Sequence, residues 1–208
     1  MSKPSNLSRR GLLRSAPTAA LVTGCTQRGA TDEPGAGLPV TSATAPAQLG
    51  PGKVPLQFSL NGKNVEVSVE PRTTLLDALR LDLDTTGPKV VCDRGACSAC
   101  TVLVDGTQRN SCMMLAHDIA GREVSTVEGL AKGKALSPLQ KAFIKRDALQ
   151  CGFCTSGMLM TCTALLRRSG GRSLTADDVN EAIAGNLCRC GTYPNVVAAV
   201  LDVAKGQA

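Results

Sequence analysis

The chain has 208 residues, a formal net charge of +6 and a content of 43% hydrophobic but only 2% aromatic residues. One or two domains with a core of Val, Leu, Ala and Met are therefore expected. Residues 1–52 carry +3 of the charge, so the remainder is only mildly basic. Basic runs interleaved with aromatic residues are absent, which argues against a nucleic-acid partner. The sequence contains no run of 18 apolar residues, so no membrane-spanning helix is predicted.

The first 25 residues are predicted to be an export leader. The run Ser8–Leu13 (SRRGLL) resembles the twin-arginine motif, and a weakly apolar stretch follows at residues 15–24. The alternative is a basic arm with an accidental arginine pair. The twin-arginine route carries folded proteins, so cofactors could be inserted in the reducing cytoplasm before the chain reaches the oxidising periplasm. We therefore predict a periplasmic protein.

Cys25 follows Val22-Thr23-Gly24, which resembles a lipoprotein processing site. Lipidation of Cys25 would anchor the mature chain to a membrane. The alternative is cleavage nearby, with Cys25 lost or unmodified. Residues 26–52 are rich in Gly, Pro, Ala, Thr and Ser and have few large apolar residues. This composition predicts a disordered linker.

Residues 53–130 are predicted to form a small mixed sheet with one helix. Residues 54–60 and 64–69 alternate apolar and polar side chains around an Asn61-Gly62 turn, which predicts a β-hairpin. A short helix is expected after Pro71. Further strands are expected at residues 101–104, just before Cys112 and at residues 123–127.

Residues 136–205 change to helical periodicity, and the boundary is expected near residues 129–136. Four helices are predicted in this all-α domain. Thr175 in the sequence TADD is expected to cap the third, and Tyr193-Pro194 to begin the fourth.

Eight of the ten cysteines form two groups of four, and the first group reads C-x4-C-x2-C-x11-C. The members of this first quartet are Cys92, Cys97, Cys100 and Cys112. Thiolates are soft, anionic ligands for iron–sulfur clusters, and this spacing is that of plant-type ferredoxins. A zinc site and a pair of disulfides are the alternatives, but three cysteines within nine residues fit zinc poorly. The first quartet therefore predicts a [2Fe–2S] cluster.

The second quartet reads C-x2-C, a gap of 33 residues, then C-x-C. Its members are Cys151, Cys154, Cys188 and Cys190. Two such loops in a helical bundle could hold zinc or a cluster equally well, so spacing alone leaves both open. Cys162 belongs to neither quartet and is predicted to be a core residue.

The residues around both quartets resemble the small iron–sulfur subunit of the xanthine oxidase family of molybdenum hydroxylases. In the second half these are residues 150–158 (QCGFCTSGM) and 185–194 (GNLCRCGTYP); in the first they are residues 99–106 (ACTVLVDG) and Ser111-Cys112. The resemblance spans residues 54–205. With the leader, the chain looks most similar to the iron–sulfur subunits of periplasmic aldehyde oxidoreductases.

This resemblance implies an α+β fold, with a plant-type ferredoxin (β-grasp) domain followed by a four-helix domain. It implies one [2Fe–2S] cluster on each quartet. It also places Gln150 and Cys190 against the molybdopterin cofactor of a large partner subunit. Electrons would pass from that cofactor through both clusters to flavin, in an FAD subunit, or to another acceptor.

The sequence departs from the family pattern in two places, and neither departure removes a ligand. Ser156 stands where many members have Pro, and Gly191-Thr192 replaces the commoner Thr-Gly after Cys190.

No catalytic residue is expected in this chain, so the substrate would be oxidised on the large subunit. Two other functions stay open: a freestanding two-cluster ferredoxin, and an exported binding protein stabilised by zinc or disulfides.

Overall fold

The computed structural model describes residues 49–206. The predicted leader, the lipidation site at Cys25 and the linker up to residue 48 lie outside the described residues. Within residues 49–206, no helix has both the length and the apolar character needed to cross a membrane.

The chain begins with the predicted hairpin of β1 (Val54–Leu60) and β2 (Lys63–Val69). The strands are antiparallel, and Leu60 pairs with Lys63 across the turn. Asn61 and Gly62 have φ values of 51° and 78°, the positive values that a two-residue hairpin turn of this type requires. The prediction of this hairpin is confirmed.

Three further strands complete a mixed sheet, namely β3 (Thr101–Val104), β4 (Thr107–Asn110) and β5 (Glu123–Ser125). The strand order is β2-β1-β5-β3-β4, in which β1 and β5 are parallel and the other neighbours antiparallel. β5 ends two residues earlier than predicted, because a 3-10 turn follows at Val127–Leu130. The short helix α2 (Leu75–Asp77) continues as a π-helical turn, Ala78–Asp82. Leu75 and Leu79 of this segment are buried in the core of the sheet half.

The helical region comprises α3 (Pro138–Lys145), α4 (Thr155–Ser169), α5 (Ala176–Ile183) and α6 (Tyr193–Ala204). Thr175 caps α5 as predicted, since its hydroxyl accepts a hydrogen bond from the N–H of Asp178. Cys162 on α4 is fully buried in the core of this region, as predicted. Residues 49–206 hold five α-helices in all, α2 in the sheet half and the others after it. A mixed sheet followed by a helical region is thus confirmed.

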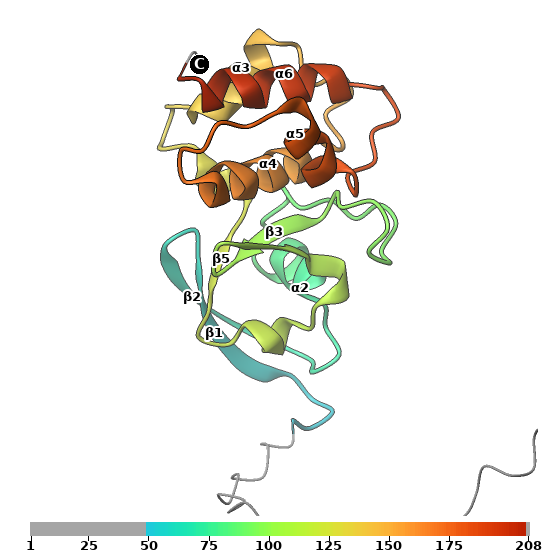
Figure 1. The fold of residues 1–208 in the computed structure, drawn as a ribbon. Coiled ribbons are helices and arrows are strands. Elements are labelled where there is room, and N and C mark those ends of the chain that lie inside the picture. Colours follow the sequence, from blue (N-terminus) through green and yellow to red (C-terminus); the bar gives the residue numbers. More distant parts are fainter. Residues whose placement is uncertain (1–48, 207–208) are drawn as a thin grey trace, which may run out of the picture. The chain divides into compact units, whose positions relative to one another are not determined.

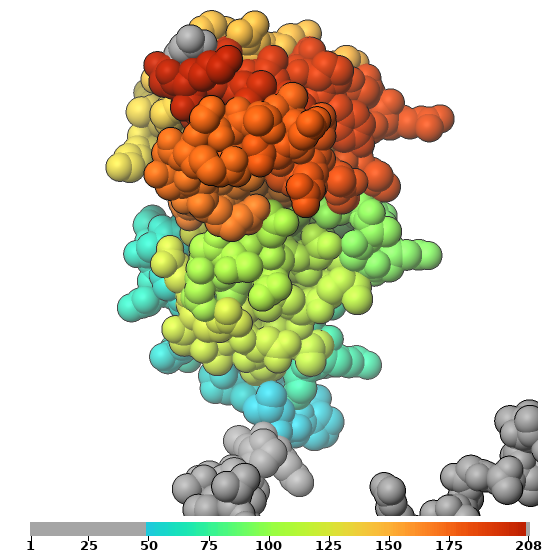
Figure 2. Space-filling model, viewed as in Figure 1, coloured from blue at the N-terminus to red at the C-terminus, as the bar shows by residue number. Residues whose placement is uncertain are grey.

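Helix α4 lies against β3, where the helical region meets the sheet half (Figure 1). Met160 and Ala164 of α4 are buried with Leu103 of β3. In the space-filling view the orange helical residues lie directly on the green residues of the sheet half (Figure 2). At the start of α4, a Cβ on Gly157 would lie 2.2 Å from the carbonyl oxygen of Ser98. Only glycine permits this approach.

We therefore expect Gly157→Ala to force α4 away from the Ser98 loop and to lower the free energy of unfolding by about 1–3 kcal/mol, as overpacking does. Denaturant unfolding followed by circular dichroism measures the change. Gly185→Ala is the matched control, because a Cβ there would be 3.4 Å from the Ser98 hydroxyl, an ordinary contact. Equal losses in the two variants would contradict the prediction.

Candidate iron–sulfur sites

Three members of the first quartet lie in the loop that leads into β3. Asp93, Gly95 and Ser98 have φ values of 51°, 72° and 54°, so the backbone turns sharply three times within the loop. Cys112 comes from the 3-10 turn Ser111–Met113 that follows β4. Because β3 and β4 are paired, Cys112 lies opposite the loop. The sheet thereby joins ligands that are distant in sequence.

The four thiols of the first quartet are close to one another and to backbone donors. The N–H of Gly95 donates to Cys112 Sγ at 3.3 Å, and the N–H of Ala96 donates to Cys92 Sγ at 3.3 Å. The Cys92 thiol also lies within hydrogen-bonding reach of Cys97, and Cys100 and Cys112 contact each other. Such amide donors stabilise negative charge on cluster sulfurs.

The thiols of this quartet differ in their pKa values. The backbone N–H of Arg94, assisted by Cys97, lowers the pKa of Cys92 to about 7. Burial raises the pKa of Cys112 to about 11. A thiol with a raised pKa needs the charge of bound iron to become a thiolate.

The second quartet spans two turns that precede helices. Cys151 and Cys154 flank the turn before α4, and Cys188 and Cys190 lie in the loop before α6. The thiols of Cys154 and Cys188 lie within hydrogen-bonding reach, with Cys151 nearby. Burial raises the pKa of Cys154 to about 12. Cys190 is half-buried, and its N–H faces the Cys188 sulfur.

The segment that carries Cys188 is attached directly to the loop of the first quartet. The N–H of Leu187 donates to the carbonyl oxygen of Cys97 at 3.1 Å. The Asn186 side chain, which is buried, donates to the carbonyl oxygen of Ser98 at 3.3 Å. The Tyr193 hydroxyl accepts from the N–H of Cys188 at 2.8 Å and donates to the carbonyl oxygen of Asn186 at 2.9 Å. These bonds fix the two cysteine loops side by side.

A cavity of about 660 Å3 lies between the two quartets. Its sulfur-bearing lining residues are Cys92, Cys97, Cys151, Cys154 and Cys188. All nine cysteines of residues 49–206 are free thiols. In the same residues, no group of three or more His, Cys, Asp or Glu side chains is arranged to hold a single metal ion. Four thiolates on a two-iron cluster are shared between the two irons, so they need not converge on one point.

The donor set fits [2Fe–2S] clusters in both places. Soft thiols, small residues in the loops and backbone N–H groups directed at sulfur are what such a cluster requires. The chemistry that such clusters supply is electron transfer.

The rim of this cavity is apolar and exposed. Val91, Phe153 and Leu187 line the cavity and are each more than half exposed. Gln150 is exposed next to Cys151, which is also exposed. Exposed apolar residues around a buried site are typical of a surface that another protein covers.

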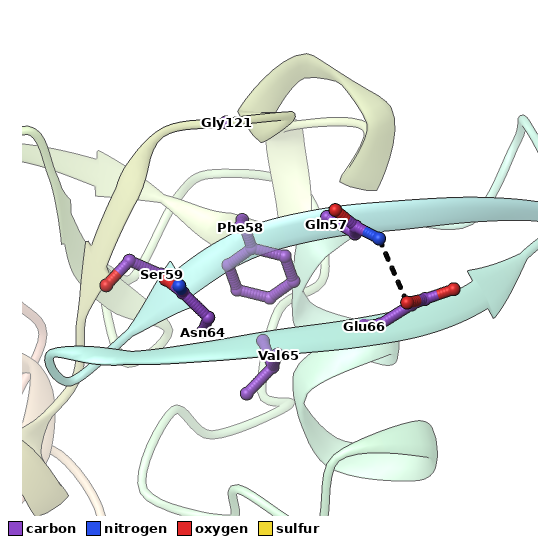
Figure 3. A pocket seen from close by; sticks show the side chains of 7 residues that line it. All are labelled: Gln57, Phe58, Ser59, Asn64, Val65, Glu66 and Gly121. Atoms are coloured by element: carbon purple, nitrogen blue, oxygen red, sulfur yellow. Dashed lines mark hydrogen bonds between the residues drawn. The ribbon is translucent and has the colours of Figure 1, made fainter.

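A second depression, lined by residues of β1 and β2 and by Gly121, holds no cysteine (Figure 3). Two of its polar side chains are paired with each other, since Gln57 Nε2 donates to Glu66 Oε2 at 2.9 Å. Nothing in this depression offers chemistry comparable to that of the cysteines.

Comparisons with known proteins agree with the assignment of the cysteine quartets as candidate iron–sulfur sites. The family described as "2Fe-2S iron-sulfur cluster binding domain" matches residues 58–130, and that described as "[2Fe-2S] binding domain" matches residues 126–201. Residues 58–201 therefore match two families of [2Fe-2S] cluster-binding domains, which defines the chain as an iron–sulfur protein.

Individual relatives show more closely which kind of iron–sulfur protein this chain resembles. The chain is 44% identical over 177 residues to the aldehyde oxidoreductase iron-sulfur-binding subunit PaoA of Escherichia coli O157:H7, covering 78% of this chain and 77% of that protein. It is 50% identical over 155 residues to the nicotine 6-hydroxylase small subunit of Paenarthrobacter nicotinovorans, covering 74% and 92%. The crystal structure of quinoline 2-oxidoreductase from Pseudomonas putida 86 matches with a TM-score of 0.69 at 40% identity, covering 74% of this chain and 98% of that one.

The chain belongs to the family of small iron–sulfur electron-transfer subunits of molybdenum hydroxylases, the xanthine oxidase family.

Replacing Tyr193 tests whether its hydroxyl holds the loop that carries Cys188. We expect Tyr193→Phe to lower the free energy of unfolding by about 1–3 kcal/mol, because it leaves two backbone groups beside Leu187 without their partner. Denaturant unfolding of the unaltered and variant chains measures the difference. Indistinguishable curves would show that the hydroxyl does not hold this loop.

Proposed function

We propose that each quartet ligates one [2Fe–2S] cluster, the first held by the sheet half and the second by α3 to α6 acting as a four-helix cluster-binding domain. The observation that supports this proposal is the shared cavity, which cysteines of both quartets line. Each bound cluster would accept and release one electron at a time. The protein supplies thiolates, amide donors and an apolar surround.

The proposed path for electrons runs from a molybdopterin centre on a large partner subunit, through the second and then the first cluster, to flavin in an FAD subunit or to another acceptor. The exposed Gln150 and the half-buried Cys190 are the residues we propose to contact that pterin. The exposed apolar rim of Val91, Phe153 and Leu187 supports a protein partner at this surface.

We also propose that the complex oxidises aldehydes and lies in the periplasm. The identity to the PaoA subunit supports the substrate class, and the twin-arginine motif at residues 8–13 supports export. Membrane anchoring through a lipidated Cys25 is compatible with both.

Replacing one cysteine per quartet tests the ligand assignment. We expect Cys97→Ala to abolish one of two paramagnetic resonance (EPR) signals of the reduced protein, and Cys151→Ala to abolish the other, because each cluster loses a ligand. Cys162→Ala is the matched control: its buried thiol packs in the core, so both signals should remain. Loss of both signals in either ligand variant would contradict independent sites.

Replacing the two arginines of the leader tests the proposed export. We expect replacement of Arg9 and Arg10 by Lys to keep this chain and the large subunit in the cytoplasm, because one leader would export the assembled complex. Cell fractionation with antibodies to both subunits measures this. A large subunit that still reaches the periplasm would refute export through this chain.

A freestanding two-cluster ferredoxin is the second candidate, because the chain itself carries both cysteine quartets. Purification from the native host separates the two. A molybdenum-containing subunit that co-purifies supports the hydroxylase, whereas a soluble single chain with both clusters supports the ferredoxin.

A further inference from the structure

Thr192 occupies the N-cap position of α6 but does not cap the helix. An N-cap threonine commonly accepts a hydrogen bond from the N–H two or three residues on. Here the side chain makes no such bond. Its hydroxyl oxygen lies 3.3 Å from Cys188 Sγ instead. Thr192 is only 3% exposed, so water does not compete for the hydroxyl.

The local backbone holds the hydroxyl in this place. Gly191 has a φ of 81°, a left-handed conformation that turns the chain between Cys190 and Thr192. The carbonyl oxygen of Thr192 accepts the first helical bond of α6, from the N–H of Val196 at 3.0 Å. The N–H of Cys188 is bound to the Tyr193 hydroxyl. Both partners of the contact are therefore anchored.

The direction of the hydrogen bond follows from the charge on sulfur. A neutral thiol could donate or accept, but a thiolate can only accept, so the Thr192 hydroxyl must donate to it.

The two quartets differ in the kind of donor they receive. At the first quartet, the hydrogen bonds to sulfur come from the backbone N–H groups of Gly95 and Ala96. At the second, Cys188 receives a side-chain hydroxyl as well. A substitution at Thr192 can therefore alter one site without disturbing the other.

We propose that the Thr192 hydroxyl raises the reduction potential of the second cluster by donating to the Cys188 thiolate. This inference rests on the proposed role of Cys188 as a ligand. Reduction adds one electron and makes the cluster and its thiolates more negative. A donor directed at a ligand sulfur stabilises the reduced form more than the oxidised form, and so raises the potential.

The proposal has a consequence for the direction of electron flow. A higher potential holds the electron on the second cluster and makes its onward transfer to the first cluster less favourable. The order Gly191-Thr192, in place of the commoner Thr-Gly, positions this hydroxyl at the N-cap of α6. Thr192 thus acts on the second cluster through the Cys188 sulfur and is not a catalytic residue.

The test is an EPR-monitored redox titration of the full chain with both clusters. Thr192→Val, which keeps the shape of the side chain, should lower the potential of the second cluster and leave the first unchanged. We expect a shift of about threefold to tenfold in the reduction equilibrium, where tenfold is about 59 mV for one electron. Thr192→Ser keeps the hydroxyl and should keep the potential.

Thr163→Val is the matched control, because Thr163 lines a separate depression beside α3 and should change neither potential. Thr192→Ala provides a second removal of the hydroxyl should the valine disturb packing. Unchanged second-cluster potentials in both Thr192→Val and Thr192→Ala would overturn the inference, as would an equal decrease in Thr192→Ser. Absence of both signals from the unaltered chain would overturn the cluster assignment itself.

Discussion

The carbonyl oxygen of Ser98 is where the sheet half and the helical region are joined. It accepts from the N–H and the hydroxyl of Thr101 at 3.3 and 2.7 Å, and from the Asn186 side chain at 3.3 Å. Gly157 leaves the space that lets α4 approach it. Because Ser98 lies between two cysteines of the first quartet, and Asn186 lies two residues before Cys188, this junction fixes both cysteine loops together. A partly buried polar junction of this kind is costly to leave unpaired, which favours a single arrangement.

The two cysteine sites then differ in their chemistry although they share one cavity. The first is wrapped by a loop with three left-handed turns and receives backbone donors. The second is built from two helix-preceding turns and adds the hydroxyl of Thr192. Thiols with raised pKa values, Cys112 and Cys154, occur in both. Hydrogen bonds to sulfur are one way in which a protein sets the reduction potential of a cluster, so the two sites can differ in potential.

Much of this could be predicted from the sequence, because local signals were strong. Asn61-Gly62 predicted the hairpin turn, the TADD sequence at Thr175 predicted the cap of α5, and cysteine spacing predicted the candidate sites. The roles of Gly157, Asn186 and Thr192 could not be predicted, because each depends on a partner brought close only by the tertiary fold. The π-helical turn after α2 and the early end of β5 were missed for a similar reason, since periodicity is insensitive to such changes of a few residues. The spacing of the second quartet left zinc open, and the family resemblance was needed to favour a cluster.

The central claim is that the two quartets hold two binuclear iron–sulfur clusters in one chain. The most direct measurement is quantitative analysis of iron, zinc and inorganic sulfide in the intact protein purified from its native host. The account predicts equal amounts of iron and sulfide, about four atoms of each per chain, with no stoichiometric zinc. A folded, functional chain that contains zinc, or neither iron nor sulfide, would contradict it.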